Sequence, residues 1–153
     1  MAIASVIQNS AKADLLRAGT NFNTSGGTPA GHAFKIALYL STTTIDTTTT
    51  AYGGPSNEVS GTGYSSGGNA LTNTGVGTTT VTSFTDFSDT SWTSASFTAR
   101  GCLIYNTDVL TGFTTNRSVC TIDFGGNKTV SSGTFTIQFP TNDASDAIIR
   151  ITS

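Results

Sequence analysis

Residues that could carry out chemistry are few in this chain and widely spaced. His32 is the only histidine, so any Ser-His-Asp machinery would have to use it. Residues 63–67 read G-x-S-x-G, the motif that presents a nucleophilic serine between a strand and a helix. No helical pattern follows that motif, so we interpret it as a turn and His32 as a solvated loop residue. The sequence therefore predicts a protein that is not an enzyme and has no catalytic residues.

The two cysteines allow a disulfide but do not require one. An antiparallel hairpin with its turn near Thr111 would place Cys102 opposite Cys120, at a Cα separation within disulfide range. Thiols of a protein made in the cytosol stay reduced, and free cysteine is commonly a small buried hydrophobe. We favour two buried free thiols and keep the disulfide as the alternative. Two cysteines and one distant histidine are too few ligands for structural zinc.

Two close pairs of carboxylates lie in turn-like segments. One pair is Asp86 and Asp89, and the other is Asp143 and Asp146. Aspartate in a turn usually accepts hydrogen bonds from its own neighbouring backbone. Either pair could join carbonyl oxygens around Ca²⁺, but the spacing matches no dedicated calcium loop. We therefore predict no metal site and no cofactor.

Four aromatic side chains form the only set on which a carbohydrate could stack. They are Tyr52, Tyr64, Trp92 and Tyr105. Tyrosine and tryptophan are mostly buried in folded proteins, so we favour core packing for all four. A carbohydrate-binding module, with Trp92 and Tyr64 as its first candidates, stays open as an alternative function.

The length and charge of the chain limit the classes of partner. A chain of 153 residues can bury about two-thirds of its unfolded surface, which is enough for one core. Seven Lys and Arg against nine Asp and Glu give a net charge of −2, so there is no basic footprint for nucleic acid. No stretch approaches the ~18–20 apolar residues of a membrane span. We predict neither nucleic acid nor membrane as a partner.

From residue 33 onward the pattern is one of short strands separated by turns. In residues 34–40, for example, Phe34, Ile36 and Leu38 fall on one face by strict alternation. We predict strands at 33–41, 57–60, 70–75, 78–87, 92–98, 99–106, 117–124, 129–139 and 146–152. No helical periodicity interrupts them. The predicted fold class is all-β: a single antiparallel β-sandwich, jelly-roll or Ig-like, over residues 33–153.

Residues 1–32 differ from the rest and are predicted to form an arm with a short helix. Ser10 is a suitable N-cap, residues 11–18 form the helix, and Gly19 ends it. A helix of about two turns does not persist alone in water, so it must dock on something. The apolar residues available for this contact are Val6, Ile7, Leu15, Leu16 and Phe22. The partner is either another subunit or the chain's own sandwich, which the arm would then close as a flap.

Several short motifs follow one another in a fixed order along roughly residues 33–152. They begin with ALY at residues 37–39, TID at 44–46, NEVSGTGY at 57–64 and LTN at 71–73. They continue with FTARG at residues 97–101, LIYN at 103–106, DFGG at 123–126, SGTFTI at 132–137 and FPTND at 139–143. This ordered set resembles the small β-sandwich structural proteins of tailed-bacteriophage particles.

The resemblance implies a structural role in a virion. It suggests a decoration or cement protein on the outside of the capsid, with a tail or head-fibre component as the alternative. The expected partners are the major capsid protein or other virion subunits. A homo-oligomer is expected as well, and a trimer is the natural guess for local three-fold positions. The protein would be made in the host cytoplasm and end in the virion.

Overall fold

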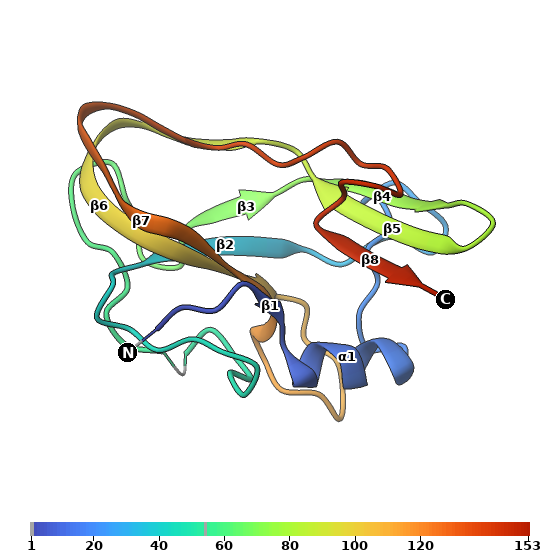
Figure 1. The fold of residues 1–153 in the computed structure, drawn as a ribbon. Helices are drawn as coiled ribbons and strands as arrows, with labels where there is room; N and C mark the ends of the chain where they lie inside the picture. The colour runs from blue at the N-terminus through green and yellow to red at the C-terminus, as the bar shows by residue number, and fades with distance from the viewer. Residues whose placement is uncertain (1, 54) are drawn as a thin grey trace.

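The computed structural model describes residues 2–53 and 55–153, which form two antiparallel sheets and one short helix (Figure 1). The elements in chain order are β1 (Val6–Ile7), α1 (Asn9–Leu16), β2 (Phe34–Tyr39), β3 (Asn69–Leu71), β4 (Asn73–Thr78), β5 (Thr82–Phe87), β6 (Thr90–Asn106), β7 (Arg117–Ile137) and β8 (Ile149–Thr152). The larger sheet has the order β1-β7-β6-β2-β3, and the smaller has the order β4-β5-β8. The prediction of an all-β sandwich with a short N-terminal helix is confirmed.

Strand β2 is buried on both faces, although its sequence predicted one core face. Phe34, Ile36 and Leu38 belong to the main core, as alternation requires. Ala37 and Tyr39 are also fully buried, in a second cluster on the opposite face of the sheet. Residues 3 and 45, which lie outside the sheets, supply part of that cover. The alternation identified the strand, but it could not show that loop segments fold over its second face.

Several predicted strand boundaries are wrong. The segments 92–98 and 99–106 form one continuous strand, β6, and 117–124 and 129–139 largely merge into β7. The residues between Asp123 and Lys128 bulge out of β7, because Gly101 pairs with Asp123 while Ala99 already pairs with Lys128. The predicted strand 78–87 is instead divided by a turn, in which the Thr79 N–H donates to the carbonyl of Thr82.

The register of the β6–β7 hairpin differs from the predicted one by two residues. Cys102 lies opposite Ile122, and Cys120 lies opposite Ile104. The two cysteines are therefore not directly opposed, and both are free and buried. The favoured interpretation of two buried thiols matches the structure.

Helix α1 begins and ends one or two residues earlier than predicted. Gln8 is the N-cap, so Ser10 lies inside the helix, where its hydroxyl is 3.3 Å from that of Ser118. At the other end Ala18, not Gly19, takes the left-handed conformation, with φ 57°. The Gly19 N–H donates to the carbonyl of Asp14 over 2.7 Å, the bond that defines a Schellman ending.

Replacing Ala18 with glycine is expected to raise the free energy of unfolding by about 0.5–1 kcal/mol, because an L-residue with a Cβ is disfavoured at positive φ. Ala18 is exposed, so loss of its methyl group costs little packing. Chemical denaturation followed by circular dichroism would measure the change. The control is Ala13→Gly in the same helix, where helical φ makes glycine destabilising by about 1 kcal/mol. Equal losses in both variants would contradict this account of the helix end.

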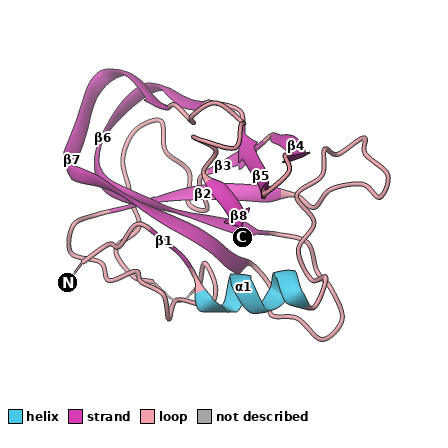
Figure 2. Cartoon of the chain, turned by 45° about the vertical axis from the view of Figure 1, so that its right-hand side comes forward, coloured by secondary structure: helices cyan, strands magenta, loops and turns pink. Residues whose placement is uncertain are grey.

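The N-terminal segment packs against the chain's own sandwich (Figure 2). Ile3 forms an isolated bridge with Ile45, and β1 pairs antiparallel with the start of β7. Phe22 is buried in the main core, with its ring stacked 5.0 Å from that of Phe34. This is the flap arrangement, one of the two alternatives that the sequence left open for the arm.

Arg117 is a buried cation that joins the N-terminal segment to the connection between β6 and β7. Only 2 % of its side chain is exposed. Its guanidinium donates to the carbonyls of Gly19 at 2.9 Å, Asp108 at 3.0 Å and Thr114 at 3.2 Å. It also forms an ion pair with Asp14 of α1 at 3.5 Å. One side chain therefore holds the end of the helix against a loop that lies about a hundred residues later in the chain.

Glu58 is the centre of a second polar cluster, beside β2. One carboxylate oxygen accepts hydrogen bonds from the Tyr64 hydroxyl and the Gly67 N–H, both at 2.7 Å. The other accepts from the Tyr52 hydroxyl at 2.7 Å and the Ser66 hydroxyl at 2.9 Å. The anion thereby fixes the turn at residues 63–67, which is the segment that carries the G-x-S-x-G pattern. That pattern serves a structural turn, because a satisfied glutamate and not a histidine holds it in place.

Candidate interaction surface

The structure separates the predicted contact residues into three places. Val6 and Ile7 line a groove beside β7, whereas Leu15 and Phe22 line a second groove beside α1. Leu16 belongs to neither groove and is 91 % exposed. Phe22 lines its groove although its ring is buried in the main core. Contact of these five residues with another subunit stays a prediction.

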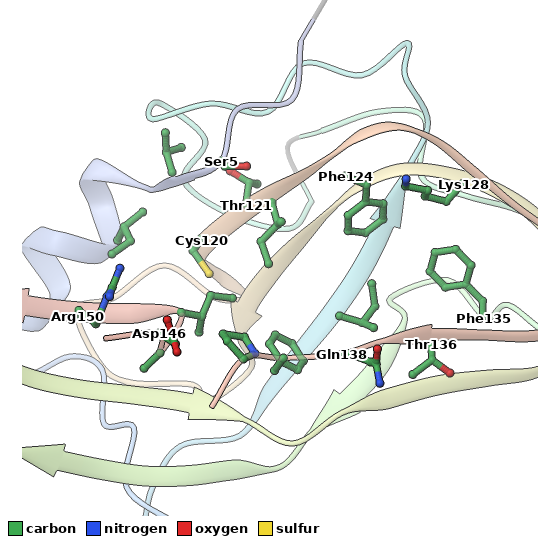
Figure 3. A pocket seen from close by; sticks show the side chains of 18 residues that line it. Ser5, Cys120, Thr121, Phe124, Lys128, Phe135, Thr136, Gln138, Asp146 and Arg150 are labelled. Carbon is green, nitrogen blue, oxygen red and sulfur yellow. The ribbon is translucent and has the colours of Figure 1, made fainter. Parts of the chain in front are cut away.

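The larger groove lies between β1 and β7 on one side and the segment leading into β8 on the other. Its volume is about 830 Å³. Most of the side chains that give it an apolar lining are only partly buried in the core: Ile7, Ile122, Phe124, Phe135, Phe139 and Ile148. Figure 3 shows Arg150 and Asp146 at one end of this groove and Phe124, Lys128 and Phe135 at the other. The sandwich is thus incompletely closed along this side.

The smaller groove lies between the C-terminal end of α1 and the sheet β4-β5-β8. Its volume is about 390 Å³. Its lining includes Leu15 from the helix, Val76 from β4, and Ile149 and Ile151 from β8. Val76 is 55 % exposed and Ile151 is 59 % exposed, which is high for apolar strand residues. Exposed apolar surface of this kind commonly marks a contact with another macromolecule.

Strand β8 is the wall that the two grooves share. Arg150 of β8 and Ile148, the residue just before the strand, line the larger groove, whereas Ile149 and Ile151 of β8 line the smaller one. This division follows from the pleat, because successive side chains of a strand point to opposite faces. The sequence predicted a strand at residues 146–152, but it gave no indication that both faces of that strand border open grooves.

His32 is placed as a structural residue. Its Nδ1 lies 2.9 Å from the side-chain nitrogen of Asn106 and 3.4 Å from the backbone nitrogen of Asn21. Because both neighbours are donors, Nδ1 is the acceptor and the ring proton lies on Nε2. Among the hydrogen bonds of the described residues, none joins His32 to a serine, threonine or cysteine side chain. Burial lowers the pKa of His32, and the nearby carboxylate of Asp108 partly offsets this effect.

The lowered pKa of His32 predicts a loss of stability in mild acid. Above its ordinary pKa of 6.5 the residue is neutral in both the folded and the unfolded chain, so it has no effect. As the pH falls through 6.5, the unfolded chain gains a proton that the folded chain resists, and the free energy of unfolding declines. The decline ends once the pH passes the lower folded-state pKa. Urea unfolding at a series of pH values, for the wild type and His32→Gln, would measure this contribution as the difference between the two curves. Parallel curves would contradict it.

Both thiols are buried, and one carboxylate of each aspartate pair accepts hydrogen bonds from the backbone. Burial raises the pKa of Cys120 to about 12 and also raises that of Cys102, so neither is a ready nucleophile. Asp86 accepts from the backbone N–H groups of Phe87 and Ile148, and burial raises its pKa. Asp143 likewise accepts from the two backbone N–H groups of residues 145 and 146. Across residues 2–53 and 55–153, no three His, Cys, Asp or Glu side chains gather as a metal would require.

The four aromatic residues proposed for sugar stacking do not form an open platform. Trp92 and Tyr105 are each only 3 % exposed. Tyr52 stacks on Tyr105 with ring centroids 4.6 Å apart, and Tyr64 lies against Trp92 at 6.0 Å. These rings pack against one another, so the structure gives the carbohydrate alternative no specific support.

Comparisons with known proteins give no relative for this chain. No protein-family model, no curated protein and no solved structure matches it. In the part of the chain that the structure describes, no helix is both long enough and apolar enough to span a membrane. Function must therefore be argued from the motifs and from the grooves beside β8.

Proposed function

We propose that this chain is a structural protein of a tailed-bacteriophage virion, bound to the outside of the head as a decoration or cement protein. The observation that carries the proposal is the ordered set of motifs along residues 33–152. The geometry is compatible with it in two respects. The side chains of His32, Glu58, Arg117 and the two cysteines serve internal contacts, and the partly exposed apolar side chains that line the two grooves beside β8 offer surface for a neighbouring subunit to bury.

The proposal is tested by locating the protein on purified particles. Mass spectrometry of gradient-purified virions should detect the chain in stoichiometric amount, and electron microscopy should place its density on the head. Recombinant protein should then bind to heads that lack it, and light scattering should give its oligomeric state. Density on the tail or on head fibres would replace the head assignment with the alternative. Absence from particles would overturn the proposal.

Leu16→Ser tests whether the exposed helix residue contributes to this attachment. Because Leu16 is 91 % exposed, the substitution is expected to change the free energy of unfolding by less than about 0.5 kcal/mol. If the side chain is buried against another subunit, attachment should weaken by about tenfold, as the loss of one apolar contact predicts. Binding to stripped heads, compared with that of Val109→Ser, would measure the effect. Val109 is 77 % exposed and lies in the β6–β7 connection, outside both grooves, so it controls for the loss of an exposed apolar side chain.

A further inference from the structure

The sandwich has four outer sheet edges, and three of them are poorly suited to accept another strand. Strand β3 has only three residues, and the ladder of β4 with β5 contains an irregularity. The edge of β7 is partly covered by β1, and its ladder with β6 changes register four times. Short strands and bulges of this kind are common means of preventing edge-to-edge pairing. In contrast, β8 pairs with β5 in an uninterrupted register from Ile149 to Thr152.

Strand β8 is also the edge that lies between the two grooves. A strand added along its free edge would continue the sheet β4-β5-β8, with its side chains pointing alternately to the two faces. One set would enter the larger groove beside Ile148 and Arg150, and the other would enter the smaller groove beside Ile149 and Ile151. Backbone hydrogen bonds would supply affinity and the two grooves would supply side-chain selectivity, as in known cases of strand addition.

We propose that the free edge of β8 is an acceptor site for an extended strand from a partner polypeptide. The strand carries apolar side chains on both faces, with the larger ones directed into the 830 Å³ groove. It carries a carboxylate opposite Arg150. The identification of the partner as another virion protein rests on the proposed function, whereas the acceptor site itself does not.

The positive charge of Arg150 supports an acidic residue on the added strand. Among the described residues the ion pairs are Arg100 with Asp123 and Arg117 with Asp14. Arg150 is exposed, and its charge has no partner within ion-pair distance in this set. An acidic residue directly opposite it on an added antiparallel strand would be favourable, whereas a second cation there would be unfavourable.

A second copy of β8 fits this site less well than a foreign strand. Pairing of two β8 strands about a two-fold axis at Arg150 would place two guanidinium groups directly opposite each other. In any antiparallel two-fold register, the copy's Arg150 and Thr152 would face the larger groove, whose lining is mostly aromatic and aliphatic. That arrangement would leave apolar surface against polar side chains, so the geometry favours a partner with a different sequence.

A strand supplied within the same molecule tests the acceptor site directly. The Ser153 N–H donates to the carbonyl of Val81 and so faces β5, which means that the two-residue turn must begin one residue later. The full chain is extended after Ser153 by one threonine, an asparagine–glycine turn and the strand threonine, threonine, leucine, valine, glutamate, valine. This places leucine and glutamate toward the larger groove, with glutamate opposite Arg150, and the two valines toward the smaller groove. The control extension keeps the turn and replaces leucine, both valines and glutamate with serine, serine, serine and lysine. Fusion in cis raises the effective concentration of the strand, so weak intrinsic affinity does not hide binding.

The apolar extension is expected to raise the Tm by about 3–6 °C over the control. It should also slow hydrogen exchange of the outward-facing amides in residues 149–153 by about tenfold or more. Because it fills the site, it should abolish attachment to stripped heads, while the control extension still attaches. Equal exchange in the two extended proteins would overturn the acceptor site.

The remaining outcomes separate the inference from the proposed function. If the apolar extension protects β8 but attachment persists, the virion partner does not use this edge and the assigned occupant is wrong. If the wild type self-associates in solution and only the apolar extension makes it monomeric, the occupant is a second copy, which also overturns the assignment. If the wild type is absent from particles and never attaches, the proposed function fails, and the exchange measurement decides the acceptor site alone.

Discussion

Replacing Arg117 with alanine is expected to lower the free energy of unfolding by about 3–5 kcal/mol, a large share of the stability of an ordinary domain. The loss combines two effects. The buried carboxylate of Asp14 is left without its cation, and the carbonyls of Gly19, Asp108 and Thr114 lose their donor. Unsatisfied buried groups cost more than the hydrogen bonds contribute when formed, because water cannot replace the missing partner.

Chemical denaturation of the Arg117→Ala protein would measure this effect, with Arg17→Ala as the control. Arg17 is exposed, at the C-cap of α1, so its removal is expected to change the free energy of unfolding by less than about 0.5 kcal/mol. Hydrogen exchange should also accelerate in residues 9–19 and 107–116, the two segments that Arg117 joins. Similar stability of the two variants would show that the buried cation is not needed.

Replacing Glu58 with glutamine is expected to lower the free energy of unfolding by about 2–3 kcal/mol, since hydrogen bonds to a charged acceptor are among the stronger ones. Each carboxylate oxygen accepts two hydrogen bonds, from Tyr64 and Gly67 on one side and from Tyr52 and Ser66 on the other. In glutamine one of these oxygens becomes an NH₂ group. This group is itself a hydrogen-bond donor, and it would face the two donors that the oxygen had accepted from.

The matched control for Glu58→Gln is Asp146→Asn, which removes the same charge from an exposed side chain. Its effect is expected to be within about 0.5 kcal/mol. Loss of order in the turn at residues 63–67 should appear as faster exchange of the Gly67 amide. If Glu58→Gln retained the stability of the wild type, the hydroxyl groups would have to reorient without cost, and the cluster would not stabilise the turn as described.

The sequence predicted the fold class and most strand positions because these depend on local patterns. Alternation in residues 34–39 and the turn residues between segments can each be recognised from a short stretch of sequence. The bulge in β7 could not be predicted from the sequence. Gly125 and Gly126 look like a turn between two strands unless it is known that the residues on both sides of them pair with β6. The two-residue error in hairpin register has a related cause, since a long connection does not fix which residues pair.

The polar clusters and the grooves depend on contacts between distant parts of the chain. The partners of Arg117 include Gly19, which is 98 residues away. Glu58 offered one usable signal, because it is the only glutamate and lies within six residues of both Tyr52 and Tyr64. No local signal exists for the grooves, since their walls come from the N-terminal segment, β7 and the final residues. Side-chain alternation in β8 becomes informative only after those walls are placed.

The pairing of β1 with β7 has a consequence for how the chain is synthesised. Val6 pairs with Thr121, and the Thr121 hydroxyl donates to the Ala4 carbonyl 117 residues away. Strand β1 therefore leaves the ribosome early, yet its partner strand follows only after most of the chain has been made. Contacts of such long sequence separation form slowly, because the loop between them must first be closed. We therefore expect β1 to join its sheet late, because a nascent chain shorter than about 120 residues does not yet contain the edge of β7 on which β1 pairs.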